Sequence, residues 1–132
     1  MEYTVFTRKE FPKEKFRKMT PTVRFSRRTG VVYFSKAAVE MMDLHDGDKV
    51  EVLQSQRDAQ MLGFRKTSNP LGFELYDRRA GMGFAAHRLT YRILALFGTN
   101  IGFTVQLGTE PMEGAYWIIT KSLIKTTSNG NR

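Results

Sequence analysis

The sequence predicts a β-rich α+β fold in which one β-β-α-β-β unit occurs twice. Two observations lead to this expectation. Short runs of alternating apolar and polar residues are separated by turns that contain glycine, which is typical of strands joined by hairpins. The order of these runs also repeats after 51 residues. With 132 residues and no cysteine, the chain has the size of one compact domain without disulfide bonds.

The first unit covers residues 23–66 and begins with a predicted hairpin. Gly30 ends the hairpin turn, at a place where a positive φ angle favours glycine. Ser35 follows the second strand and is a preferred N-cap residue, so it predicts the start of a helix. A glycine turn at residues 45–48 leads to the last two strands. The elements are expected at residues 23–26, 31–34, 36–44, 50–52 and 61–64.

The second unit covers residues 76–120 and follows a turn-rich linker at residues 66–72. A shift of 51 residues without a gap places Gly30 on Gly81, and two arginines precede this glycine in both copies. The remaining elements are expected at residues 87–97, 101–107 and 115–120. We therefore expect a single body over residues 21–120, a basic N-terminal arm over 1–20 and a flexible C-terminal tail over 121–132.

Positive charge is concentrated at both ends of the chain. The formal net charge is +8 and the isoelectric point is near 10.0. Residues 1–28 contribute +6 and residues 76–132 contribute +4, whereas residues 29–75 contribute −2. Such an excess of lysine and arginine predicts a polyanionic partner without identifying which one.

The sequence contains no pattern that supports catalysis or metal binding. The absence of cysteine excludes a thiolate nucleophile and a cysteine zinc site. His45 and His87 have neither the spacing of a metal site nor that of a catalytic triad. We therefore expect no enzyme and no cofactor. No apolar run is long enough to span a bilayer and the N-terminus lacks a signal-peptide core, so we expect a cytoplasmic protein without a membrane partner.

The first unit resembles the AbrB/SpoVT and MraZ families of bacterial swapped-hairpin DNA-binding proteins. The resemblance lies in RRTGVVYFSKAAVEMMDLHDGDKVEV, followed by AQMLGFRK, and it is closest from Leu44 to Val50. It implies that two such units interlock their hairpins into one pseudo-twofold barrel, here as tandem copies in one chain. It also implies a basic DNA-binding face. The families usually carry an arginine directly after the hairpin glycine, where this chain has Val31 and Met82. They also carry a proline before the helix, where this chain has serine and alanine. The family's arginine position is therefore not transferred to this chain.

The candidate binding residues lie at the two predicted hairpin tips and at the helix starts. Guanidinium groups at a hairpin tip fit phosphate oxygens and guanine edges, and a pseudo-twofold axis would bring two arginine pairs to one surface. The competing interpretation is that exposed arginines only keep the protein soluble. The predicted nucleic-acid-binding residues are Arg24, Arg27, Arg28, Lys36, Arg78, Arg79, His87, Arg88 and Arg92.

These observations favour a duplex DNA-binding transcriptional regulator, or a phage- or chromosome-associated factor, that uses the hairpin tips and the basic arm. One alternative is a single-strand binder of the whirly type, in which aromatic rings stack on bases. The stacking rings would be Tyr33, Phe34, Tyr76 and Phe84. Another alternative is a structural protein that packs beside nucleic acid in a larger particle. The sequence is also compatible with a homo-oligomer.

Overall fold

The computed structural model describes residues 2, 4 and 20–125, so most of the predicted arm and the end of the predicted tail lie outside the described residues. Within this range no helix is long and apolar enough to cross a membrane. The elements are β1 (Thr22–Phe25), β2 (Val31–Ser35), α2 (Lys36–Met42), β3 (Lys49–Gln54), β4 (Leu62–Thr67), β5 (Phe73–Glu74), β6 (Tyr76–Arg78), β7 (Gly81–Ala85), α3 (His87–Leu96), β8 (Phe103–Leu107) and β9 (Tyr116–Lys125).

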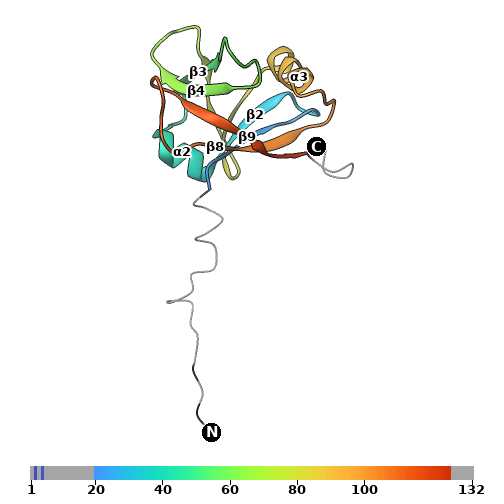
Figure 1. Ribbon diagram of the computed structural model, residues 1–132. Helices are drawn as coiled ribbons and strands as arrows, with labels where there is room; N and C mark the ends of the chain where they lie inside the picture. The colour runs from blue at the N-terminus through green and yellow to red at the C-terminus, as the bar shows by residue number, and fades with distance from the viewer. Residues whose placement is uncertain (1, 3, 5–19, 126–132) are drawn as a thin grey trace.

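The nine strands form one antiparallel sheet in the order β5-β3-β4-β9-β8-β1-β2-β7-β6. Its two end strands, β5 and β6, are separated in the chain by Leu75 alone, which is fully buried. The Leu75 N–H donates to the carbonyl of Asp48, and the Leu75 carbonyl accepts from the N–H of Gly47, both at 2.8 Å. Because one short segment forms both ends, the sheet is a nearly closed, barrel-like structure (Figure 1). The prediction of a β-rich fold is confirmed.

β9 joins the two sides of this sheet. Its first residues, Tyr116 and Trp117, pair with β4, and its later residues pair with β8. The pairing with β8 shifts between Thr104 and Gln106, where the strand bends. β9 continues through Lys125 and therefore reaches into the tail that the sequence predicted from residue 121. The helices α2 and α3 lie on opposite sides of the molecule (Figure 1).

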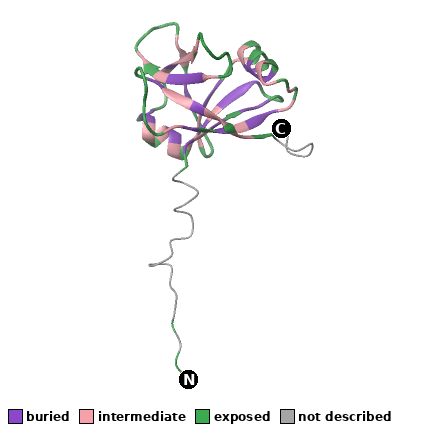
Figure 2. Ribbon diagram, viewed as in Figure 1, coloured by how far each residue is buried: buried purple, intermediate pink, exposed green. Residues whose placement is uncertain are grey.

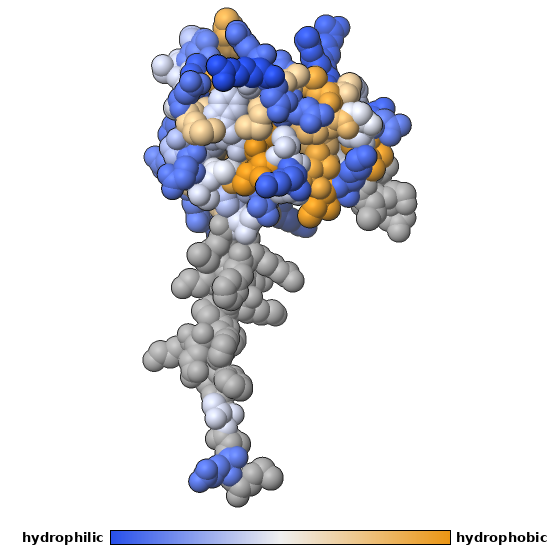
Figure 3. Space-filling view, viewed as in Figure 1, coloured by the Kyte–Doolittle hydropathy of each residue, from blue (hydrophilic) through white to orange (hydrophobic). Residues whose placement is uncertain are grey.

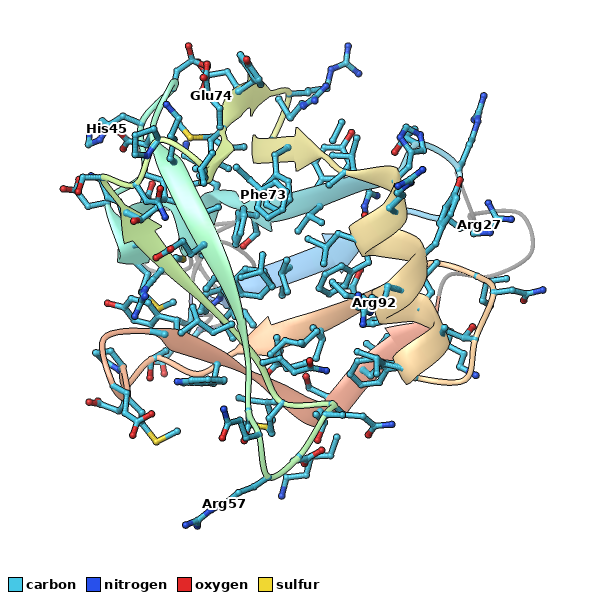
Figure 4. All side chains as sticks on the ribbon, turned by 90° about the horizontal axis from the view of Figure 1, so that it is seen from above. Arg27, His45, Arg57, Phe73, Glu74 and Arg92 are labelled. Atoms are coloured by element: carbon cyan, nitrogen blue, oxygen red, sulfur yellow. The ribbon has the colours of Figure 1, made fainter. Side chains whose placement is uncertain are left out.

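The core is rich in phenylalanine. Most of the buried residues belong to the strands, as the colouring of Figure 2 shows, and they form one hydrophobic cluster. The rings of Phe34 and Phe64 meet edge-on at 5.2 Å, and those of Phe73 and Phe84 stack at 4.5 Å. Figure 4 shows Phe73 inside the barrel. Burial of each large side chain contributes roughly 1.5–3 kcal/mol, so these rings are a main source of stability.

The local signals at the first hairpin and helix are confirmed. Gly30 has a φ angle of +68°, as its turn position predicted. The Ser35 hydroxyl accepts a hydrogen bond from the N–H of Ala38 at 3.2 Å and caps α2. The helix ends at Met42 instead of residue 44, because Asp43 adopts the left-handed conformation at its C-terminus.

The ungapped match of the two units fails at the level of single strand residues. Phe25 is fully buried, whereas its partner in the match, Tyr76, is 51% exposed. Tyr33 is partly exposed, whereas its partner Phe84 is 2% exposed. Side chains alternate between the two faces of a strand, so an alignment that is wrong by one residue equates opposite faces. The 51-residue register is therefore wrong within these strands, although each half has the predicted order of elements.

Candidate nucleic-acid interface

The outer face of strands β1, β2, β7 and β6 carries a row of paired residues. Arg24 pairs with Tyr33, Tyr33 pairs with Gly83, and Gly83 pairs with Tyr76. Paired residues of antiparallel strands point to the same side of the sheet. Because the neighbours of Arg24, Val23 and Phe25, face the core, this row faces outward.

An open groove of about 410 Å³ lies on this face. Arg24, Tyr33, Arg78 and Arg79 line it, together with Gly81 and backbone of the second hairpin. A Cβ atom at Gly81 would collide with the carbonyl oxygen of Phe34. Gly81 therefore allows β7 to approach β2 closely, and unlike Gly30 it does not have a positive φ angle.

Two arginines share one tyrosine ring in this groove. The Cζ atom of Arg24 lies 4.5 Å from the centroid of the Tyr33 ring, and that of Arg78 lies 6.0 Å from the same centroid. These are cation–π distances. None of the ion pairs between described residues includes either arginine. The groove is therefore a positively charged site without a carboxylate counterion among residues 20–125.

A second arginine–tyrosine contact lies where the first hairpin meets α3. The Cζ atom of Arg27 lies 4.5 Å from the centroid of the Tyr91 ring, and the His87 ring meets Tyr91 edge-on at 6.0 Å. The Gly30 carbonyl accepts from the Thr90 hydroxyl at 2.9 Å, which fixes the hairpin tip on the helix. Figure 4 shows Arg27 at the edge of the molecule beside α3.

The structure thus divides the predicted site residues into groups. It brings Arg24, Arg78 and Arg79 into one groove, and it joins Arg27 and His87 through Tyr91. The two hairpin tips lie at opposite ends of the β2–β7 pair, since Val31 pairs with Ala85 at one end and Ser35 pairs with Gly81 at the other. The other predicted residues are exposed and have no ion pair among the described residues: Arg28, Lys36, Arg88 and Arg92.

The sequence interpretation missed the tyrosines as partners of the arginines. The Arg24–Tyr33 contact could have been found from the hairpin turn, because the turn sets which residues lie opposite each other. Tyr91 follows His87 by one helical turn and therefore shares its face of α3. The contact between Arg78 and Tyr33 has no local signal, since it depends on the pairing of β2 with β7.

The cations on the β3–β4 side of the molecule have carboxylate partners. Arg65 pairs with Glu51 at 2.9 Å, and Lys66 pairs with Asp48 at 3.2 Å. The side-chain hydrogen bond from Arg65 lowers the pKa of Glu51. Burial acts to raise the pKa of Asp48, but hydrogen bonds from the His45 backbone and from Lys66 outweigh it, so the pKa of Asp48 lies below its ordinary value. These ion pairs distinguish this side from the arginine groove.

The outer side of the β4–β9 pair carries an apolar hollow around Trp117. A cavity of about 810 Å³ there is lined by Leu53, Met61, Met112 and Trp117, together with polar side chains. The indole N–H of Trp117 donates to the carbonyl of Met112 at 2.9 Å, which fixes the ring. Figure 3 shows apolar side chains gathered on the face that β9 crosses. No group of three or more potential metal ligands occurs within the described residues.

The burial pattern removes two of the rings proposed for base stacking. Phe34 is 1% exposed and Phe84 is 2% exposed, so neither ring is accessible to a base. Both belong to the core and face inward, Phe34 from β2 opposite Met82 and Phe84 from β7 opposite Val32. Tyr33 and Tyr76 remain on the outer face.

Comparisons of the chain with protein-family models, curated proteins and solved structures found no match.

Proposed function

We propose that this protein binds nucleic acid, with duplex DNA as the favoured ligand, through the outer face of β1, β2, β7 and β6 and the hairpin tip beside α3. One observation carries this proposal. Arg24 and Arg78 converge on a single ring in an open groove without a carboxylate partner among the described residues, whereas Arg65 and Lys66 on the β3–β4 side are ion-paired.

Arginines in this arrangement suit a polyanion. A guanidinium group presents a planar set of N–H donors that matches the oxygens of a phosphate. Release of counterions from the nucleic acid makes such binding strongly dependent on salt. The net charge of +8 supports the same partner class through long-range attraction.

We also infer that the two halves of the chain are related by a pseudo-twofold axis, as in the swapped-hairpin families that the first unit resembles. The strand order supports this relation. Exchange of β1 with β6, β2 with β7, β3 with β8 and β4 with β9 leaves all neighbours unchanged when β5 and β6 are treated as one segment. This relation favours a DNA-binding regulator or a phage- or chromosome-associated factor. A cytoplasmic location is part of the same proposal.

Neutralisation of arginines at both hairpin tips should weaken DNA binding and flatten its dependence on salt. About one counterion is released for each phosphate contact, so three lost contacts should reduce the slope of log affinity against log salt by roughly two to three. Fluorescence anisotropy with labelled duplex DNA, single-stranded DNA and RNA at several salt concentrations measures this slope. The variant carries Arg27→Gln, Arg78→Gln and Arg79→Gln.

A matched control removes the same formal charge from other surfaces. It carries Lys49→Gln, Arg57→Gln and Lys121→Gln, and Figure 4 shows Arg57 and Arg27 at different edges of the molecule. The control variant keeps Arg65 and Lys66, because their loss would also break ion pairs. If the control variant loses as much affinity as the hairpin variant, binding depends only on the overall charge of the protein. The outer face of β1, β2, β7 and β6 is then not a specific binding site. If the wild type binds none of the three probes, the proposed function is rejected. If it binds a single-stranded probe more tightly than duplex DNA, the single strand is the favoured ligand.

A further inference from the structure

We propose that Tyr33 is a positioning residue that holds Arg24 and Arg78 as a clamp for the phosphodiester backbone of the bound nucleic acid. This inference rests on the proposed function and adds the part of the ligand that enters the groove. The clamp contacts backbone charge and not base edges, so its contribution does not depend on base sequence.

The clamp is assembled from three strands, and its two arginines come from β1 and β6, which are not neighbours in the sheet. Arg24 lies directly opposite Tyr33 in the β1–β2 ladder. Arg78 belongs to β6, which β7 separates from β2. The residue of β7 that pairs with Tyr33 is Gly83. A Cβ atom there would come within 2.7 Å of the Val32 carbonyl oxygen, so glycine allows β7 to lie close to β2. Because glycine has no side chain, none stands at this position between the Tyr33 ring and Arg78.

The two guanidinium groups leave positive charge in the groove that an anion can neutralise. Both Cζ atoms lie within 6.0 Å of one ring centroid, and no carboxylate among residues 20–125 pairs with either. The ring face attracts each cation but neutralises neither. A phosphodiester supplies one negative charge and two free oxygens, and a guanidinium stacked on a ring keeps its N–H edges available for them.

The shape of the site favours the backbone over the bases. Arg24 and Arg78 line a hollow instead of a ridge. Base edges are recessed in the grooves of duplex DNA and are read by elements that project into those grooves. Phosphate groups lie on the outside of the duplex and can enter a hollow. The clamp therefore fixes the position of the protein on the nucleic acid.

Replacement of the Tyr33 ring should weaken binding although both arginines remain. Each exposed cation–π contact contributes modestly, and loss of two contacts predicts roughly tenfold weaker binding for Tyr33→Leu. Tyr33→Phe keeps the ring and should bind close to the wild type. The probes are one duplex of fixed sequence, a second duplex of different base composition, and the first duplex with neutral methylphosphonate linkages. Tyr33→Leu should lose equal affinity for both natural duplexes and less for the neutral one.

Tyr76→Leu is the matched control. Tyr76 lies in the same outward row and is 51% exposed, but none of the cation–π contacts among residues 20–125 includes its ring. Because no arginine among residues 20–125 stacks on its ring, Tyr76→Leu should lose clearly less affinity than Tyr33→Leu. An equal loss for Tyr76→Leu would indicate that bases stack along the row, and a loss for Tyr33→Phe as large as for Tyr33→Leu would indicate a contact of the hydroxyl. Either result would overturn the clamp.

A double variant, Arg24→Gln with Arg78→Gln, keeps the inference testable if Tyr33→Leu fails to fold, which thermal unfolding would show. The double variant should lose at least as much affinity as Tyr33→Leu, with equal losses for both natural duplexes. Where both variants fold, a triple variant that adds Tyr33→Leu to the double variant should bind DNA with the same affinity as the double variant. A loss that differs between the two base compositions would show base readout and contradict the clamp. If the wild type binds no nucleic acid, the proposed function fails; if the arginine variants weaken binding and Tyr33→Leu does not, only the clamp fails.

Discussion

The Ser35 hydroxyl connects two elements through one oxygen atom. It accepts a hydrogen bond from the N–H of Ala38 in α2 at 3.2 Å and another from the N–H of Thr22 in β1 at 2.9 Å. An unpaired N–H at the start of a helix or strand carries a free-energy cost when it is removed from water. Ser35 therefore stabilises the start of α2 and also fixes β1 next to the groove, which Thr22 and Ser35 both line.

Ser35→Ala should destabilise the fold by about 1 kcal/mol or somewhat more, because it removes a helix cap and a second hydrogen bond. Urea unfolding followed by circular dichroism measures the change in the free energy of unfolding. Ser35→Thr, which keeps the hydroxyl, should recover most of the loss. Ser68→Ala, at an exposed loop position, serves as the control and should be neutral. Equal stability of Ser35→Ala and Ser68→Ala would show that the Ser35 contacts contribute nothing.

The β3–β4 hairpin is stabilised by charge pairs, in contrast to the hairpins of the proposed binding face. Glu51 and Arg65 are directly paired across the two strands, and their side chains form an ion pair. Lys66 reaches from β4 to Asp48 just before β3, and its ammonium also donates to the carbonyl of Asp43 at 2.8 Å. These contacts fix the loop after α2 against β4. The loop in turn holds Leu75 through its backbone.

Acid should destabilise the protein through these carboxylates. The pKa values of Asp48 and Glu51 lie below their ordinary values of 3.8 and 4.5, so the folded state favours the ionised forms. Their contribution is therefore present above about pH 4.5 and is lost as the pH falls through the lowered pKa values. We expect the free energy of unfolding to fall with acid more steeply in the wild type than in Asp48→Asn with Glu51→Gln. Denaturant unfolding between pH 6 and pH 3 measures both slopes.

The control for this experiment carries Glu40→Gln and Glu110→Gln. Both residues are exposed, and neither belongs to an ion pair between described residues. It should keep the pH dependence of the wild type. Parallel curves for the wild type and for the Asp48–Glu51 variant would show that the two ion pairs do not contribute to stability, as is common for exposed pairs.

The whole molecule presents two opposed faces. Around the sheet, three steps separate β9 from β2 by way of β8 and β1, and the same number separates β4 from β7. The β4–β9 pair, with Trp117 on its outer side, therefore lies across the barrel from the β2–β7 pair and its arginine groove. A ligand in the groove leaves the apolar hollow accessible.

Binding of duplex DNA should leave the fluorescence of Trp117 unchanged. Trp117 is the only tryptophan of the chain, so its emission reports on the apolar hollow alone. A second protein, with Trp117→Phe and Tyr33→Trp, moves the reporter into the groove, and its emission should be quenched by the same DNA. A shift of the Trp117 emission maximum in the wild type, without quenching in the second protein, would show that DNA binds beside Trp117. This result would contradict binding in the arginine groove.

Local features of the fold could be predicted from the sequence because they depend on neighbouring residues. Gly30 ends a hairpin turn, Ser35 caps a helix, and the order of strands and helices follows from short hydrophobic patterns. The arginines at the hairpin tips were predicted for the same reason, since polar residues next to a turn glycine are exposed. The prediction that these arginines bind nucleic acid depended on residue type and charge alone.

Only the tertiary structure determined which side chains face inward and which meet across the sheet. Phe34 and Phe84 resemble exposed stacking rings in sequence, but both point into the core because β2 and β7 pair at these positions with the same face inward. The closure of the sheet at Leu75 and the approach of Arg78 to Tyr33 also depend on strands far apart in the chain. The physical reason is that strand pairing sets the face and the neighbours of every side chain, and the pairing partners of a strand are fixed by the packing of the whole core.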